Sequence, residues 1–194
     1  MKRTLLFLVA VAAAASVSGQ RTPFQVQQAL SDAVVRERQA IARYDAYAAR
    51  ADSDGYAGAA SLFRAAAKSE AVHLRRFTEL MTARGVTPPV EQASAVHPGT
   101  TRQNLAQACE AEQSERDGAY RDAINACMTN RDDEAAKVFD QTRDAEVEHL
   151  NLCAAAGRDL EAMRQARQYV VCDHCGYVSE IRLGFCPICR SATR

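Results

Sequence analysis

The chain of 194 residues contains no tryptophan, and aromatic residues make up only 6% of it. Its formal net charge is zero, so it lacks the basic surface by which proteins bind nucleic acid. It also lacks a glycine-rich dinucleotide fingerprint, so any nicotinamide reductant must act through another protein. The composition therefore favours a small-molecule or protein partner and excludes a nucleic-acid partner.

No apolar run is long enough for a membrane span. The run Leu5–Ala15 has eleven residues, whereas a span needs about 20. It follows Lys2 and Arg3 and precedes the small residues Ser16–Gly19, which is the pattern of a signal peptide. We expect residues 1–19 to be a cleaved signal peptide, with a retained N-terminal anchor as the alternative. Its removal leaves 22 basic and 24 acidic residues, in a protein expected in an exported compartment, the bacterial periplasm.

Proline is scarce, and three of the five prolines fall within residues 85–100. The alanine-rich stretches on both sides favour helix, and their apolar residues recur every three or four positions. This spacing predicts helices at about residues 24–52, 56–84, 101–128 and 133–165. Two helical hairpins joined by a long crossover form a four-helix bundle. The predicted fold class is thus an all-α four-helix bundle, over residues 20–167.

Two Glu-x-x-His motifs stand out, at Glu70–His73 and Glu146–His149. Positions three apart share one face of a helix, so each motif directs a carboxylate and an imidazole toward one point, as metal ligands require. One such motif is a weak signal. Here a second copy follows the first after 76 residues.

The motifs belong to a longer internal repeat. The pairs at an offset of 75 are Leu30–Leu105 and Glu37–Glu112, and those at 76 are Phe63–Phe139, Glu70–Glu146, His73–His149 and Leu74–Leu150. Because acids and histidines repeat together with apolar residues, we expect a site with approximate twofold symmetry.

Four glutamates fall inside the apolar helix faces: Glu37, Glu70, Glu112 and Glu146. A fifth, Glu115, lies one turn beyond Glu112. Burying each carboxylate costs several kcal/mol, and two divalent metals would supply four compensating charges. Many carboxylates with one imidazole per metal suit iron or manganese better than zinc. The alternative is a set of surface glutamates on amphipathic helices.

The last segment, residues 168–194, contains two CxxC motifs separated by ten residues, formed by Cys172, Cys175, Cys186 and Cys189. Paired motifs at this separation are a strong metal signal. So short a segment cannot bury a stable core, so the metal would supply its folding energy. Four thiolates accept iron or zinc, and a structural zinc ribbon is the alternative to an iron site. His174 and His97 are not expected to be ligands.

Together these motifs resemble the rubrerythrin family, in which a ferritin-like di-iron bundle precedes a rubredoxin-like tail. The resemblance covers nearly all of residues 25–190. It implies two irons in the bundle and one in the tail. The implied bundle ligands are Glu37, Glu70, His73, Glu112, Glu115, Glu146 and His149.

The resemblance also implies a role for each ligand. Glu70 and Glu146 would bridge the irons, and Glu37 and Glu112 would be terminal. His149 would hold one iron. The other iron would bind Glu115 when oxidised and His73 when reduced.

Two tyrosines lie close to the expected ligands: Tyr44 follows Glu37 by seven residues, and Tyr120 follows Glu112 by eight. The family has tyrosines there too, and we expect both to orient carboxylates. The alternative is a pair of buried aromatic rings with satisfied hydroxyls.

The function implied by the resemblance is reduction of hydrogen peroxide to water in oxidative-stress protection. Paired metals would split the O–O bond. An external donor protein would supply electrons through the tail iron, and in a homodimer a neighbour's tail would approach the bundle. The alternatives are a ferroxidase or iron-storage protein with a structural tail, and a metal-stabilised bundle without chemistry.

Three cysteines remain: Cys109, Cys127 and Cys153. A hairpin turning near residue 131 places Cys109 and Cys153 at one level, on the inward faces of their helices. We expect them to face each other, either as a disulfide, which an oxidising compartment favours, or as two buried thiols. Cys127 lies near the turn and is expected to have no partner.

Overall fold

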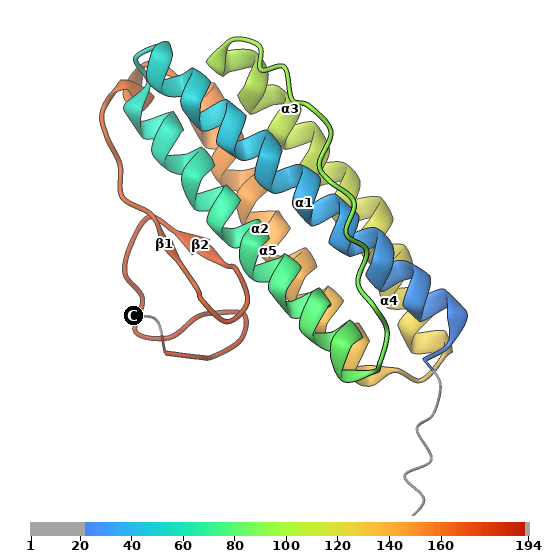
Figure 1. The fold of residues 1–194 in the computed structure, drawn as a ribbon. Coiled ribbons are helices and arrows are strands. Elements are labelled where there is room, and N and C mark those ends of the chain that lie inside the picture. Colours follow the sequence, from blue (N-terminus) through green and yellow to red (C-terminus); the bar gives the residue numbers. More distant parts are fainter. Residues whose placement is uncertain (1–21, 193–194) are drawn as a thin grey trace, which may run out of the picture.

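The computed structural model describes residues 22–192, and its helices form one antiparallel bundle (Figure 1). The elements are α1 (Phe24–Ser53), α2 (Ala57–Ala83), α3 (Thr101–Ser114), a π-helical turn η1 (Glu115–Ala119), α4 (Tyr120–Thr129) and α5 (Asp133–Arg158). The predicted fold class, a four-helix bundle with a cysteine-rich tail, is confirmed. No helix between residues 22 and 192 is long and apolar enough to cross a membrane. The expected signal peptide lies outside the described residues, and the domain boundaries stay predictions.

The sequence predicted one continuous third helix over residues 101–128, but the structure contains a break in it. A π-helical turn, Glu115–Ala119, separates α3 from α4. Such a turn accommodates one extra residue within a helix. It lies between Glu112, at an offset of 75 from Glu37, and Tyr120, at 76 from Tyr44. The inserted residue therefore accounts for the change of offset between the two halves of the bundle.

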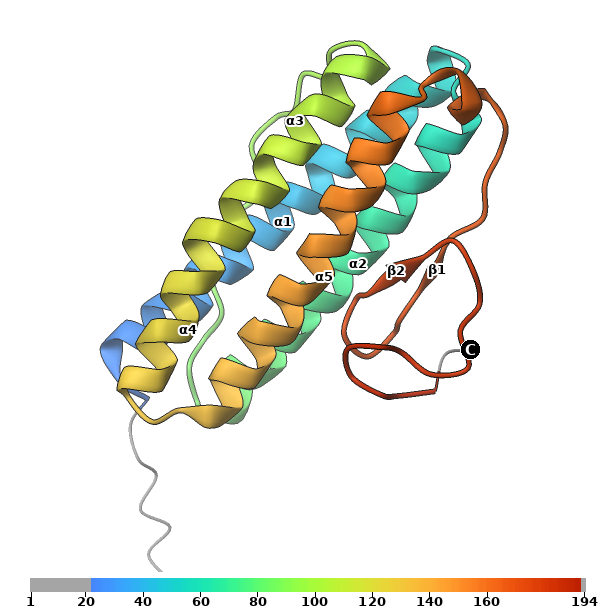
Figure 2. The same ribbon diagram turned by 180° about the vertical axis from the view of Figure 1, so that it is seen from behind.

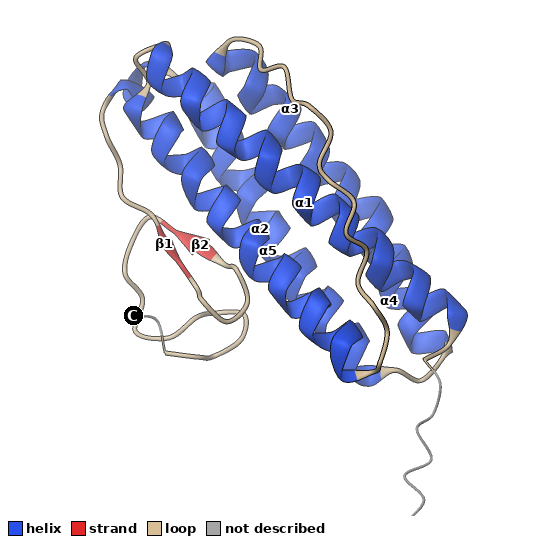
Figure 3. Ribbon diagram, in the orientation of Figure 1, coloured by secondary structure: helices blue, strands red, loops and turns tan. Residues whose placement is uncertain are grey.

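The crossover between α2 and α3 runs along the length of α1 as a loop (Figures 1 and 3). Gly85 begins it with a φ of 68°, a conformation that glycine adopts at little cost. Arg38 of α1 donates to the carbonyl of Pro89, and the Ser94 amide donates to Gln39 Oε1 at 2.7 Å. These hydrogen bonds fasten the crossover to the helix that it covers.

The last helix ends earlier than predicted, at Arg158 rather than near residue 165. Asp159 leaves the helical conformation, with φ −126° and ψ 69°, and its carboxylate accepts from the Ala162 amide at 3.1 Å. Aspartate competes for backbone amides in this way, and here it starts the short 3₁₀ turn η2 (Glu161–Arg164). Beyond η2 the chain turns back beside α2 and α5 (Figure 2).

The interior of the bundle contains two apolar clusters with the polar ligand layer between them. One cluster includes Tyr44 and Phe63, whose ring centroids are 6.1 Å apart. The other includes Tyr120 and Phe139, also with centroids 6.1 Å apart. On α1, Glu37 lies between residues of the two clusters. The apolar packing thus fixes the helices on both sides of the site.

The tail contains a small antiparallel ribbon of β1 (Val170–Val171) and β2 (Val178–Ser179). Val171 pairs with Val178 across the ribbon. Val171 and Val178 form an apolar cluster with Ala65 of α2. This contact places the tail on the outer face of the bundle, beside α2.

Candidate metal centre

The candidate ligands of the bundle converge at its centre, between the two apolar clusters. They form two groups, in each of which the ligand atoms lie within 4.8 Å of one another: Glu37, Glu70, His73 and Glu146, and Glu70, Glu112, Glu146 and His149. Glu70 and Glu146 belong to both groups. Each of them can therefore contact two metal positions, whereas the other four residues can contact one.

Each imidazole directs its Nδ1 atom at the shared carboxylates. His73 Nδ1 lies 2.8 Å from Glu70 Oε2 and 3.2 Å from Glu146 Oε1. His149 Nδ1 lies 2.7 Å from Glu146 Oε2 and 3.4 Å from Glu70 Oε1. The two motifs therefore meet as an approximately symmetric pair.

The donor set fits a pair of divalent metals. Its six members are at most 2% exposed. Glu37 Oε2, both Glu146 carboxylate oxygens and His149 Nδ1 are buried and make no well-aligned hydrogen bond, although His149 Nδ1 and Glu146 Oε2 are only 2.7 Å apart. Buried polar atoms are normally satisfied, and metal ions between these atoms would satisfy them. Carboxylates with a single imidazole per position suit iron or manganese.

Without metal, the buried carboxyl and imidazole groups of the site have shifted pKa values. Burial, together with neighbouring carboxylates, raises the pKa of Glu37, Glu112 and Glu115 to about 8. Burial alone would lower the pKa of His73 and His149, but the charge of Glu146 and its neighbours raises both well above the usual value. The site therefore retains protons at neutral pH, and metal binding must displace them.

The two tyrosines contact carboxylates across the bundle rather than within their own half. Tyr44 of α1 donates to Glu112 of α3, and Tyr120 of α4 donates to Glu37 of α1. Both rings are fully buried. The sequence predicted that the phenols lie near the ligands, but spacing within a helix cannot indicate this exchange between halves.

Glu115 occupies a different environment from the other carboxylates. Its side chain is 14% exposed, and its Oε1 lies 3.6 Å from Arg43 Nη2. It is in neither four-residue group, although the charges of Glu112, Glu146 and Glu70 all raise its pKa. Arg43, whose guanidinium carbon lies 5.3 Å from the Tyr44 ring centroid, was not identified from the sequence.

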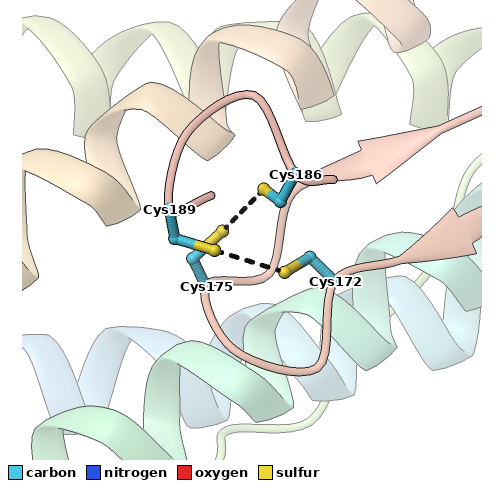
Figure 4. Close-up of side chains that lie close together, drawn as sticks. All are labelled: Cys172, Cys175, Cys186 and Cys189. Atoms are coloured by element: carbon cyan, nitrogen blue, oxygen red, sulfur yellow. Dashed lines mark hydrogen bonds between the residues drawn. The ribbon is translucent and has the colours of Figure 1, made fainter. Parts of the chain in front are cut away.

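The four tail cysteines face one another, as Figure 4 shows. The sulfur of Cys172 lies 3.6 Å from that of Cys189, and the sulfur of Cys175 lies 3.4 Å from that of Cys186. A metal bound by four thiolates at about 2.3 Å holds the sulfur atoms roughly 3.8 Å apart. The tail thus provides a nearly preformed tetrahedral site, as predicted from the paired CxxC motifs.

The tail packs directly against its own bundle at the first CxxC motif. His73 Nε2 lies 3.1 Å from the carbonyl oxygen of Cys175, and Ser69 donates to the carbonyl of Gly176 at 2.5 Å. A Cβ on Gly176 would lie 2.2 Å from His73 Nε2. The close approach therefore requires glycine, and it joins a bundle ligand to a tail ligand within one chain.

The remaining cysteines and histidines lie outside both centres. Cys153 belongs to one apolar cluster and Cys109 packs against it. Both are free thiols, so the structure has the second of the two expected alternatives rather than the disulfide. Cys127 belongs to the other cluster. His97 and His174 are exposed, as expected for residues that are not ligands.

Comparison with known proteins bears on the identity of the chain. A family model, Rubrerythrin, matches residues 28–157. The chain belongs to the rubrerythrin family. It is 28% identical over 163 residues to nigerythrin of Nitratidesulfovibrio vulgaris, covering 82% of this chain and 79% of that protein. It is 29% identical over 180 residues to rubrerythrin of Porphyromonas gingivalis, covering 90% of this chain and 88% of that protein.

Solved structures place the rubrerythrin-type fold in a wider class. A fully reduced, all-ferrous nigerythrin superposes with a TM-score of 0.79 at 25% identity, over 92% of this chain and 88% of that one. A bacterioferritin of Mycobacterium tuberculosis superposes with a TM-score of 0.66 at 20% identity, over 74% of this chain and 89% of that one. Rubrerythrins are di-iron proteins of oxidative-stress defence and belong to the oxidoreductases. The bacterioferritin likeness shows the shared bundle fold.

Proposed function

We propose that this rubrerythrin-type protein is a non-haem di-iron peroxidase that reduces hydrogen peroxide to water in an exported compartment. The observation that carries the proposal is the direct contact between the two centres. His73 Nδ1 faces the shared carboxylates, and its Nε2 lies 3.1 Å from the Cys175 carbonyl. A one-electron tail site joined to a two-metal site is suited to redox turnover, which iron storage does not require.

The reaction consumes two electrons and two protons for each peroxide and yields two waters. The irons, when bound, supply the Lewis acidity and the electrons for breaking the O–O bond. Glu70 and Glu146, which belong to both ligand groups, would hold the two metals, while Tyr44 and Tyr120 orient the carboxylates of Glu112 and Glu37. Glu115 is the one carboxyl of the site with appreciable side-chain exposure, at 14%, so we assign it the transfer of protons from solvent.

The electrons would enter through the tail. An external donor protein would reduce a tail iron held by the four cysteines, and the Cys175–His73 contact would pass the electron to the bundle. Because that contact lies within one chain, the relay does not need a neighbour's tail. The homodimer and the periplasmic location remain part of the proposal.

Substitution of Cys172 by serine tests the relay. We expect the variant, when its bundle is reduced in advance, to react once with peroxide like the parent, because Cys172 belongs only to the tail cluster. Sustained turnover with a reduced one-electron donor protein should fall by about 100-fold or more, since the thiolate site then lacks one of its ligands. Stopped-flow absorbance measures the first reaction and peroxide consumption the second.

Cys127→Ser is the matched control, because Cys127 lies in the bundle outside both metal groups. It should retain sustained turnover. Undiminished turnover in Cys172→Ser would reduce the tail to a structural role.

The second candidate function is a ferroxidase or iron-storage activity with a structural zinc tail. Two observations favour it: the bundle shares its fold with a bacterioferritin, and a tetrahedron of four thiolates also suits zinc. Metal analysis of natively loaded protein separates the two functions. Iron in the tail supports the peroxidase, and zinc in the tail supports storage.

A further inference from the structure

The face of α2 that carries His73 also presents a partly buried cation to the tail. Arg76 lies one turn after His73 and two turns after Ser69. His73 contacts the carbonyl of Cys175 in the first CxxC motif, and Ser69 contacts the carbonyl of Gly176, the next residue. Residues at these spacings share a helix face. Arg76 and His174, which lies within that motif, line one cleft of about 290 Å³.

The guanidinium of Arg76 has no ion pair among the described residues. The two glutamates that line the same cleft pair with other arginines, Glu79 with Arg75 and Glu134 with Arg84. Arg76 Nη2 donates at 2.5 Å to the amide oxygen of Gln141 on α5, a neutral group. Its Nη1 is buried and has no hydrogen-bond partner among the described residues. Burial lowers the pKa of Arg76, while the charges of Cys175, Cys189 and Cys172 raise it. A metal held by the four cysteines would keep them as thiolates, and their negative charge would then favour this partly buried cation.

We propose that Arg76 is a positioning residue that raises the reduction potential of the tail metal site and so favours the electron-loaded tail. The inference rests on the proposed tail iron, whose four-thiolate donor set fits the observed cysteine geometry. Four thiolates with ferric iron carry one net negative charge, and reduction adds a second. A fixed, partly buried cation stabilises the form with more negative charge.

Arg75 supplies the contrast, because it is the neighbouring cation on the same helix and contacts the same motif. Its Nη2 donates to the carbonyl of Asp173 at 2.6 Å, but its side chain is 49% exposed. Solvent screens an exposed charge far more than a buried one. Loss of Arg75 should therefore change the tail potential much less than loss of Arg76.

The test is a redox titration of the full iron-loaded chain, in which visible absorbance follows the tail site. Arg76→Gln should shift the balance between oxidised and reduced tail by at least tenfold toward the oxidised form, or 59 mV for one electron. Arg76→Lys, which keeps the charge, should stay within about twofold of the parent. Arg75→Gln should shift the balance by less than about threefold, because its charge is screened.

Gln141→Ala gives a second route if Arg76→Gln folds poorly. It keeps the cation but removes the 2.5 Å hydrogen bond that holds it, and should lower the potential by a smaller amount. A parent-like potential in both Arg76→Gln and Gln141→Ala would overturn the proposal, and so would equal shifts in Arg75→Gln and Arg76→Gln. A parent protein whose tail gives no redox-linked absorbance change would instead overturn the proposed relay.

Discussion

His73 and His149 occupy equivalent positions in the two halves of the bundle, yet only His73 reaches the tail. Its Nε2 meets the Cys175 carbonyl, whereas the Nε2 atom of His149 is buried without a hydrogen-bond partner. Glu115 in turn occurs only in the second half, inside the π-helical turn. The two halves thus hold equivalent ligands in different surroundings: one half contacts the tail, and the other carries the additional carboxyl group of Glu115.

The largest expected effect comes from removing a carboxylate that both halves share. Glu70→Ala should bind neither metal, because Glu70 belongs to both ligand groups. Glu37→Ala, which removes a ligand of one group only, should keep the metal held by the other half. Metal analysis after dialysis measures both. Retention of two metals in Glu70→Ala would show that the halves are independent sites.

The metal-free protein should lose stability as pH rises from about 5 to about 8. Glu37 and Glu112 have pKa values of about 8 in the folded chain against 4.5 in the unfolded chain, so the native state binds more protons in this window. For each extra proton that the native state binds, a rise of one pH unit lowers the free energy of unfolding by up to about 1.4 kcal/mol. His73 and His149 act in the same direction above pH 6.5, their usual value.

Urea unfolding in a chelator, followed by circular dichroism at several pH values, measures this loss. If the halves are equivalent in charge, Glu37→Gln and Glu112→Gln should flatten the profile equally. Metal-loaded protein should lack the dependence, because metals replace the protons. A profile that rises with pH would contradict the assignment of protonated carboxyls.

Glu115 should matter for turnover and not for metal content, since it lies outside both ligand groups. Glu115→Ala should retain two metals and lose about 100-fold in peroxide turnover, the usual scale for a positioned proton donor. Steady-state kinetics with parallel metal analysis measures this. Parent-like turnover would remove the functional difference between the halves at this residue.

The smallest expected effects come from the tyrosines. Tyr44→Phe and Tyr120→Phe each remove one hydrogen bond to a terminal glutamate, and each should weaken metal binding by about tenfold. Because the contacts are exchanged between halves, Tyr44→Phe should weaken the position that includes Glu112. Competition titration with a chelator measures the two affinities. A loss at the Glu37 position instead would contradict the exchange.

The sequence predicted most of the fold because the helix faces and the repeat carry strong periodic signals. The glutamates and histidines could be assigned to one centre, since positions three apart must share a face. The ends of the helices were harder, as Asp159 shows, because a single side-chain hydrogen bond decides where α5 stops. Contacts such as those of Arg43 and Arg76 depend on packing between distant segments, which periodicity within one helix does not encode.

The π-helical turn also explains how two halves of unequal length form the same contacts. An insertion in a regular helix rotates every later residue by about 100°, and the wider turn absorbs this change so that Tyr120 still reaches Glu37. Only the second half contains the turn. The two halves therefore differ by one residue in length and still form matching carboxylate–tyrosine contacts, because the extra residue is accommodated where the helix widens.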